Sequence, residues 1–386
     1  MRIRLLCSLL LLLSSASAFA YPSFIGYGYT SCVVCHYNAA GNGPLTDYGR
    51  ALSANTISAK PFFEPNATDE ELASQSSFTA GLVELPFWLR PSFFFRELYY
   101  DTGIEGNTPS SRFIVMQLEG SLVLKSRDQN LFANATVGYA PVPQAVPANQ
   151  RDSISTLVTH EHYVAYRFSK EFTLYAGYLD QAFGIRTADH NAYIRENLQL
   201  NYNDQTHALQ FHLAGKKWES VLQAVAGDLY QDSSIRQAGG SGVFEYEFFP
   251  NTRIGASLLA TSSTFRTREM AAVHGRFGFL EGSSILAETG FSKELSPSAP
   301  SLLKQYLFFQ SSNRLSRGLF FLATVEYYSP DNYTLQPGYY RAGPSLQYFA
   351  FQRLELRADF QSTLVYSPTT VIPEIYTFFA QVHVWL

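Results

Sequence analysis

The residues of this sequence that can do chemistry are concentrated in one short stretch, Cys32-Val33-Val34-Cys35-His36. Two cysteines separated by two residues and followed directly by a histidine form the C-x-x-C-H pattern that attaches c-type haem. In such a site the two thiols form thioethers to the haem vinyl groups, and the histidine binds the iron as its proximal ligand. The spacing therefore predicts one covalent haem c, anchored by Cys32 and Cys35 and ligated by His36.

The same residue types could also form a zinc site, a redox pair or a disulfide. Cys7 lies in the apolar start of the chain, which leaves Cys32 and Cys35 as the other cysteines. A structural zinc site needs four nitrogen or sulfur ligands, and the next histidine, His160, is far along the chain. A thioredoxin-like pair needs a βαβ context, which the flanking sequence lacks. A Cys32–Cys35 disulfide stays open as an alternative, although it gives His36 no role.

A second axial ligand for the iron must come from outside the segment that carries the motif. Residues 37–115 contain neither methionine nor histidine. Met116 alternates with Ile114 and Leu118 on a face that we expect to meet lipid, and Met270 begins a strand near the outer rim. The iron therefore has either an open position or a histidine from the strands described below.

Alternation sorts those histidines by the face of the strand on which they lie. We expect His160, His162 and His207 to face outward and His212, His274 and His383 to face inward. His212 lies three residues before a Gly-Lys-Lys turn and His383 three residues before the C-terminus, so both are expected near the end of the lumen where the haem motif enters. His383 is the first candidate for the distal ligand and His212 the second; either is otherwise a polar residue of the lumen wall.

Three segments come before the strands. Residues 1–20 contain two arginines, a short apolar run and a final Ala-Phe-Ala, which together predict a secretory signal peptide. Residues 21–60 form a small α/coil haem-binding plug, in which "PLTDYGRAL" (44–52) predicts a short helix capped by Thr46. Residues 61–86 are polar and contain proline, which predicts a linker.

From residue 87 to 386, apolar and polar residues alternate in segments of a length suited to transmembrane β-strands. The 31 Phe and 25 Tyr, together with the absence of a further long apolar run, also favour a barrel over membrane-spanning helices. We therefore predict an all-β, antiparallel outer-membrane β-barrel of about sixteen strands. The predicted strands are 87–100, 112–125, 130–141, 155–168, 171–182, 205–215, 218–230, 241–249, 252–264, 270–280, 283–294, 304–314, 317–329, 339–350, 353–365 and 374–386.

Short turns alternate with longer loops along this region, such as 215–217 and 183–204. In bacterial barrels the short turns face the periplasm, and an even number of strands places both barrel ends there. The haem segment is therefore expected on the periplasmic side or in the lumen. The last strand ends on Leu386 with apolar residues at alternate positions, as in the signal read by the barrel-assembly machinery. The edge strand of a soluble β-sandwich is the other interpretation, and it does not explain sixteen strands with alternating loop lengths.

The combination of a signal peptide, one C-x-x-C-H motif and a sixteen-strand barrel resembles the fused monohaem cytochrome–porins of bacterial outer membranes. The resemblance covers the whole chain in architecture, while "YNAAGNG", which follows His36, departs from the family's pattern. At the level of motifs it is carried by Cys32, Cys35, His36, Leu45-Thr46 and Gly49-Arg50. The family is associated with Fe(II) oxidation at the cell surface, so the resemblance implies haem-mediated electron transfer through the outer membrane.

The predicted function is electron transfer between an extracellular donor and a periplasmic cytochrome or other carrier. With extracellular Fe(II) as the donor, the chain would act as an Fe(II) oxidase. Acidic residues of the expected outer loops could attract the cation, namely Asp101, Glu105, Asp152 and Asp331. The net charge of −4 gives no reason to expect nucleic-acid binding.

Two alternatives stay open. The first is a passive porin or solute channel whose N-terminal plug is clipped by a Cys32–Cys35 disulfide. The second is a haem-bearing partner subunit that passes electrons outward to a mineral.

Overall fold

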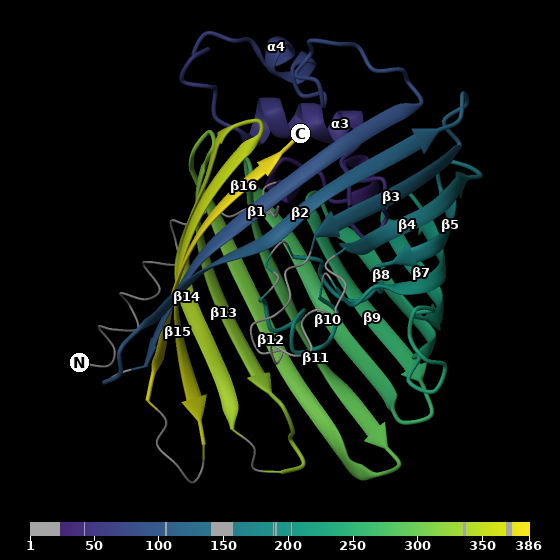
Figure 1. Cartoon of the computed structure of the whole chain (residues 1–386), viewed down its shortest axis with the longest axis vertical. Coiled ribbons are helices and arrows are strands. Elements are labelled where there is room, and N and C mark those ends of the chain that lie inside the picture. The colour runs from purple at the N-terminus through teal and green to yellow at the C-terminus, as the bar shows by residue number, and fades with distance from the viewer. Residues whose placement is uncertain are drawn as a thin grey trace.

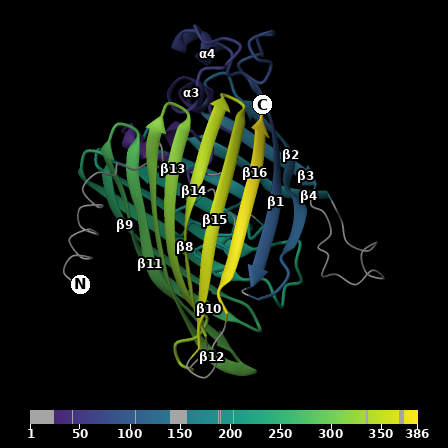
Figure 2. The same cartoon turned by 90° about the vertical axis from the view of Figure 1, so that its left-hand side faces the viewer.

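The computed structural model describes residues 24–41, 43–104, 106–139, 157–187, 189, 191–201, 203–334, 337–367 and 373–386. These residues form sixteen antiparallel strands, each hydrogen-bonded to its neighbours in sequence order, and β1 pairs with β16 to close a barrel (Figures 1 and 2). The predicted all-β antiparallel barrel of about sixteen strands is therefore confirmed. The signal peptide predicted over residues 1–20 lies outside the described residues.

The strands are β1 (Leu89–Ile104), β2 (Ser110–Lys125), β3 (Leu131–Tyr139), β4 (Leu157–Arg167), β5 (Phe172–Leu179), β6 (Thr206–Ala214), β7 (Trp218–Gly227), β8 (Ala238–Phe249), β9 (Thr252–Ser262), β10 (Thr267–Leu280), β11 (Ser283–Ser296), β12 (Ala299–Ser316), β13 (Leu319–Ser329), β14 (Gly338–Phe351), β15 (Leu354–Tyr366) and β16 (Ile375–Trp385).

Alternating polarity along each strand gives the barrel an apolar outer face and a polar inner face. In β9, Ile254 and Leu258 are exposed on the outside, whereas Ser257 and Thr261 are buried on the inside. This division is the one that a barrel in lipid requires, because apolar side chains meet the hydrocarbon and polar side chains fill the lumen. No helix in the described part of the chain is long and apolar enough to cross a membrane.

The plug, defined here as described residues 24–60, enters the barrel at the end that carries the short turns and the C-terminus (Figure 1). Its last residues lie against two of these turns: the Ala59 N–H donates to the Phe349 carbonyl at 2.9 Å, and the Arg317 Nε donates to the Ser58 carbonyl at 2.8 Å. The plug therefore occupies the short-turn end of the lumen.

Short helices build the plug and the segment that follows it, and their bounds are η1 (Cys32–Val34), α3 (Asp47–Leu52), the π-helical η2 (Ser53–Ile57) and α4 (Asp69–Ser74). The helix predicted over 44–52 is confirmed as α3, because the Thr46 hydroxyl accepts the Gly49 N–H at 3.0 Å as an N-cap. The segment 61–86, predicted as a linker, contains α4 and its Thr68–Glu71 capping box.

The loop between β5 and β6 folds into the lumen, so the prediction that 183–204 is a long outer loop is wrong. We call the described residues of 180–205 the inner loop. Phe183, Ile194 and Leu198 are almost completely buried in a cluster that includes Leu286 and other barrel residues. Burial of these apolar side chains holds the loop inside the barrel. The lumen is therefore occupied from the short-turn end by the plug and from the other end by the inner loop.

Candidate functional site

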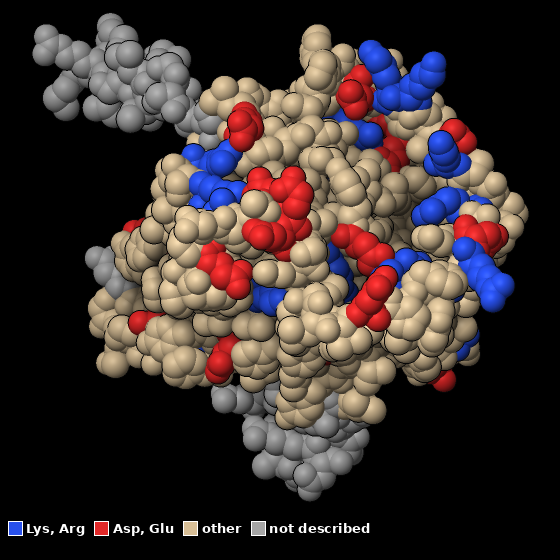
Figure 3. All heavy atoms as spheres, turned by 90° about the horizontal axis from the view of Figure 1, so that it is seen from above, with Lys and Arg blue, Asp and Glu red and all other residues tan. Residues whose placement is uncertain are grey.

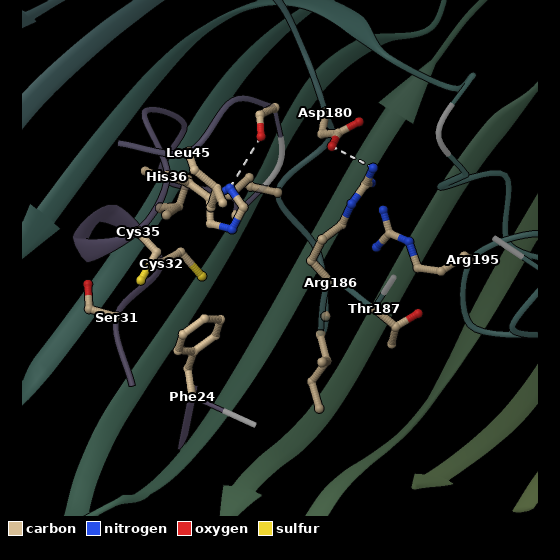
Figure 4. Close-up of a pocket in the computed structure, with 18 of the residues that line it drawn as sticks. Phe24, Ser31, Cys32, Cys35, His36, Leu45, Asp180, Arg186, Thr187 and Arg195 are labelled. Atoms are coloured by element: carbon tan, nitrogen blue, oxygen red, sulfur yellow. Dashed lines mark hydrogen bonds and ion pairs between the residues drawn. The ribbon is translucent and has the colours of Figure 1, made fainter. Parts of the chain in front are cut away.

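The C-x-x-C-H motif folds as one tight turn that gathers its three side chains. The N–H groups of Cys35 and His36 both donate to the Cys32 carbonyl, at 3.1 and 2.9 Å. Figure 4 shows the two sulfur atoms and the imidazole ring of His36 side by side at the edge of one cavity. Both cysteines are free thiols, with Cys35 buried and Cys32 partly buried. The turn thus presents two thiols and a histidine in one place without a disulfide between them.

Helix α3 and its cap hold this turn in place. The Thr46 N–H donates to the Cys35 carbonyl at 2.8 Å, the Thr46 hydroxyl donates to the Val34 carbonyl at 3.1 Å, and His36 forms a β-bridge with Leu45. Gly49 packs so closely that a Cβ placed there would lie 2.4 Å from the Cys35 carbonyl oxygen. The residues that carried the family resemblance after the motif are therefore those that position it.

Buried polar contacts join the plug to the inner wall of the barrel. The Arg50 guanidinium donates to the Pro91 carbonyl at 2.8 Å and to the Ser92 hydroxyl at 2.6 Å, both on β1. On the other side of the lumen, the Asn38 amide donates to Glu161 at 2.6 Å and the Ser31 hydroxyl donates to Glu219 at 2.8 Å. Because these partners belong to strands that are far apart, the motif has a fixed position within the lumen.

A cavity of about 340 Å³ lies between the motif, the barrel wall and the inner loop. Its apolar lining includes Phe24, Phe94, Phe183 and Trp385, and its polar lining includes several charged side chains. A haem requires this kind of environment, with apolar surfaces for the macrocycle and polar groups for its carboxylates. The residues around the cavity therefore fit such a group in chemical type.

The His36 ring is oriented by the plug itself. Its Nδ1 lies 3.4 Å from the Gly43 carbonyl oxygen, which can only accept a hydrogen bond, so Nδ1 is the protonated nitrogen (Figure 4). Metal-binding histidines commonly donate one ring N–H to a carbonyl or carboxylate in this way, which fixes the tautomer and the ring plane. His36 therefore has the orientation expected of an axial ligand that binds through Nε2.

Of the two candidates for the distal ligand, the structure brings His383 to this cavity. His383 lines it from β16, and its Nδ1 donates to the Glu355 carboxylate at 3.0 Å. Its Nε2 is buried and has no hydrogen-bond partner among the described residues. His212 is not part of the described cavity lining, and its Nε2 is hydrogen-bonded to Glu219 at 2.8 Å. The geometry therefore favours His383 over His212.

The outward assignment of His160 is wrong. His160 is buried and forms an ion pair with Glu119 on the lumen side. The cause is a β-bulge: Ala135 pairs with His162 and Val137 with Thr159, so that two residues of β4 lie opposite one residue of β3. A bulge inserts an extra residue and reverses the alternation beyond it.

The other histidines behave as the alternation predicts. His162 stacks on Tyr178 with ring centroids 5.3 Å apart, and His207 shares the outer face of β6 with the exposed Leu209. His274 is buried, with its Nε2 3.1 Å from Glu245. Met270 packs in the cluster around the inner loop and is not part of the described cavity lining.

Burial raises the pKa of both motif thiols, and that of Cys35 reaches about 11. The thiols are therefore protonated at neutral pH, whereas metal binding by cysteine requires thiolate. The described residues also contain no group of three or more His, Cys, Asp or Glu side chains that could hold a metal ion. Of the acidic residues assigned to the outer loops, Asp101 lies within β1. Asp331 accepts hydrogen bonds from Thr334 and from the backbone of its own loop, and Glu105 and Asp152 lie outside the described residues.

Sequence reasoning missed the contribution of the inner loop to the cavity. Arg186 and Arg195 line the cavity from this loop, and Figure 4 shows them across from the two cysteines. The Arg186 guanidinium forms an ion pair with Asp180 at 2.8 Å. The sequence does carry a signal for this arrangement. Apolar residues such as Phe183 and Ile185 lie close to these arginines, and so many apolar residues are unusual in an exposed loop.

The end of the molecule that carries α4 has a charged surface. Figure 3, which looks onto the end that carries α4, shows acidic and basic side chains interspersed over the surface, with acidic side chains gathered toward the middle. At the start of α4, Asp69 and Glu70 are exposed, and Asp69 forms an ion pair with Arg317 at 2.8 Å.

Comparison with known proteins identifies which structures share this fold. No family model matches the sequence, and no curated protein matches it. Solved structures do match: a loop-deletion mutant of OmpT from Vibrio cholerae has a TM-score of 0.57 at 11% identity, over 77% of this chain and 99% of that chain. The anion-selective porin from Comamonas acidovorans has a TM-score of 0.57 at 8% identity, again over 77% and 99%. OprB from Pseudomonas putida has a TM-score of 0.56 at 9% identity, over 86% of this chain and 99% of that chain. The chain therefore has the fold of an outer-membrane porin barrel.

Proposed function

We propose that this protein transfers electrons across the bacterial outer membrane through one haem c held in the lumen of its barrel. The observation that carries the proposal is the convergence of Cys32, Cys35 and His36 on a cavity that His383 also lines. Residues from the first and last parts of the chain meet there. The proposal places the protein among the cytochrome–porins that its sequence resembles.

Each residue has a distinct part in this proposal. Cys32 and Cys35 would anchor the haem covalently, His36 would bind the iron on the proximal side, and His383 would bind it on the distal side. When bound, the haem supplies a one-electron couple whose potential depends on the axial ligands, burial and hydrogen bonding. Glu355 orients the His383 ring by accepting its Nδ1–H.

The barrel and its two lumen segments would insulate this centre. The plug seals the periplasmic side, and the inner loop separates the cavity from the extracellular opening. An extracellular donor, with Fe(II) as the candidate, would lose one electron on the outer side, and a periplasmic cytochrome or other carrier would accept it. The acidic surface around α4 offers a contact for a basic carrier.

A passive channel is the second candidate, and the structural comparisons favour it, since the matching proteins include porins and channels. Two observations weigh against its simplest form. The plug and the inner loop both occupy the lumen, and Cys32 and Cys35 are free thiols rather than a disulfide clip.

The decisive experiment is to express the full chain together with a c-type haem attachment system, purify it from membranes, and denature it. We expect haem to remain bound after denaturation in stoichiometric amount and to disappear in the Cys32→Ala/Cys35→Ala double variant. The variant is a matched control, because a folded barrel still migrates faster than its heat-denatured form in a gel. Wild-type protein without covalent haem would end the cytochrome proposal.

Function is then tested in liposomes that contain an oxidised electron acceptor, with Fe(II) added outside. We expect reduction of the internal acceptor with the wild type and none with the double variant. Reversing the arrangement, with reductant inside and an oxidised mineral outside, tests outward electron flow. If both proteins conduct small ions equally and neither transfers electrons, the chain is a passive channel.

A further inference from the structure

We propose that Arg186 and Arg195 of the inner loop form a carboxylate-binding subsite that holds the propionates of the haem. This inference rests on the proposed function and extends it. It assigns a role to the inner loop as the second half of the haem pocket, opposite the plug.

The first support is position. Both side chains line the same cavity as the haem motif. Figure 4 shows the cysteine sulfurs on one side of the cavity and the two guanidinium groups on the other. In a haem c, the propionates project from the edge of the macrocycle away from the vinyl-derived thioethers. In a haem attached to Cys32 and Cys35, the propionates would therefore point toward the two arginines across the cavity.

The second support is unbalanced charge. Arg195 is only 4% exposed. Its guanidinium donates a hydrogen bond to the Phe183 carbonyl at 3.4 Å and forms no ion pair with a carboxylate of the described residues. Arg186 is paired with Asp180, but its second terminal nitrogen, Nη1, is buried without a hydrogen-bond partner in the described part of the chain. The two guanidinium groups therefore have one ion pair between them, that of Arg186 with Asp180.

The third support is the mutual repulsion of these groups. Burial and, after it, the neighbouring charge of Arg186 lower the pKa of Arg195 to about 9. Arg195 therefore remains cationic at neutral pH. Buried cations are normally compensated, because an uncompensated buried charge is strongly unfavourable. A ligand that brings two carboxylates would compensate them, and arginine binds carboxylates with two parallel hydrogen bonds.

The other carboxylates near the inner loop are already engaged. Glu288 accepts the Ile185 N–H at 2.5 Å and the Tyr306 hydroxyl at 3.0 Å, and Asp189 is paired with Arg357. Glu288 attracts Arg195 over a longer distance, but neither carboxylate forms an ion pair with it among the described residues. The open positions around the two guanidiniums are therefore available to a bound anion.

The test is the midpoint potential of the haem-loaded protein with Arg186→Gln, Arg195→Gln or both. Loss of a nearby positive charge stabilises the oxidised haem, so we expect each variant to retain covalent haem and to shift the redox equilibrium about tenfold toward the oxidised state, which is 59 mV for a one-electron couple. Arg186→Lys and Arg195→Lys should recover much of the shift, because they keep the charge. Arg266→Gln is the matched control, since Arg266 contacts the inner loop through Gln199 but is not part of the described cavity lining.

The outcomes separate this inference from the proposed function. Absence of covalent haem from the wild type overturns both. Covalent haem with the same potential in the wild type, the glutamine variants and the control overturns the subsite alone. A free carboxylate solute is the other source of this chemistry: if the glutamine variants change only the anion selectivity of the haem-free barrel in planar bilayers, the propionate assignment is wrong. Heat-modifiable gel migration shows that each variant has folded.

Discussion

His383 and Glu355 are direct partners in the pairing of β15 with β16, and the His383 Nδ1 donates to the Glu355 carboxylate at 3.0 Å. The Arg96 guanidinium lies 3.4 Å from the same nitrogen, but the closer Glu355 carboxylate can only accept, so Nδ1 carries the proton and Nε2 the lone pair. We predict that His383→Ala removes the distal ligand and changes the Soret band from that of a six-coordinate, low-spin haem to that of a five-coordinate, high-spin haem.

The same series includes Glu355→Gln, which should keep the low-spin spectrum and raise the potential, because it removes a negative charge behind the ligand. His212→Ala is the control and should leave the spectrum unchanged. A spectral change in His212→Ala but not in His383→Ala would reverse the assignment.

Gly49 lets α3 pack directly on the haem motif. A Cβ at this position would lie 2.4 Å from the Cys35 carbonyl oxygen and 2.8 Å from the Cys35 Cα, both backbone atoms that cannot move aside freely. We predict that Gly49→Ala destabilises the plug by about 1–3 kcal/mol, the usual cost of overpacking, and reduces haem attachment. Haem content per folded barrel measures this. Gly120→Ala should have no effect, because a Cβ there meets nothing within 4 Å.

Arg50 fastens the plug to the first strand. Its guanidinium is buried and donates to the Pro91 carbonyl and the Ser92 hydroxyl. We predict that Arg50→Ala weakens the docking of the plug by about 1.5–3 kcal/mol, the range for hydrogen bonds to charged groups. Faster protease cleavage within 61–86 in folded protein would report this. Lys216→Ala, at an exposed turn, should leave the cleavage rate unchanged; equal rates for both variants would contradict the role given to Arg50.

The raised pKa of Cys35 predicts the pH dependence of its reactivity in the haem-free protein. Thiolate is the reactive form, and with a pKa of about 11 instead of 9.0 its population below pH 9 is about a hundredfold smaller. In Cys32→Ser protein, alkylation of Cys35 should therefore be slow at pH 8 and rise about tenfold per pH unit up to about pH 11. The urea-unfolded chain provides the unperturbed reference. A rate that levels off near pH 9 in the folded barrel would contradict the burial of this thiol.

The sequence predicted the wall of the barrel well and the contents of its lumen less well. Strands such as β9 could be located because each residue interacts mainly with lipid or with the lumen, which imprints alternation on the sequence. His160 was assigned to the wrong face because a bulge depends on how two strands pair, and a single strand carries no sign of it.

The turn that gathers Cys32, Cys35 and His36 could also be anticipated from the sequence, because it depends on local spacing. The partners of the motif were not. Arg186 and Arg195 reach the cavity only because their loop turns inward, and this depends on packing against Leu286 and other wall residues that are distant in sequence. His383 could be chosen as the first candidate because alternation gives the face on which it lies, and its distance to the C-terminus gives its depth in the barrel.

The closing of the barrel by β1 and β16 has a consequence for biogenesis. In the folded molecule Cys32 and Cys35 lie inside the lumen, where an enzyme that attaches haem could not reach them. Attachment would therefore precede closure, on a chain still held in the periplasm. His383 belongs to the last strand made, so the distal side of the pocket would be completed only when that strand joins the first. The absorption spectrum of the haem would then change at the final step of membrane insertion. The cofactor would therefore report when its own barrel closes.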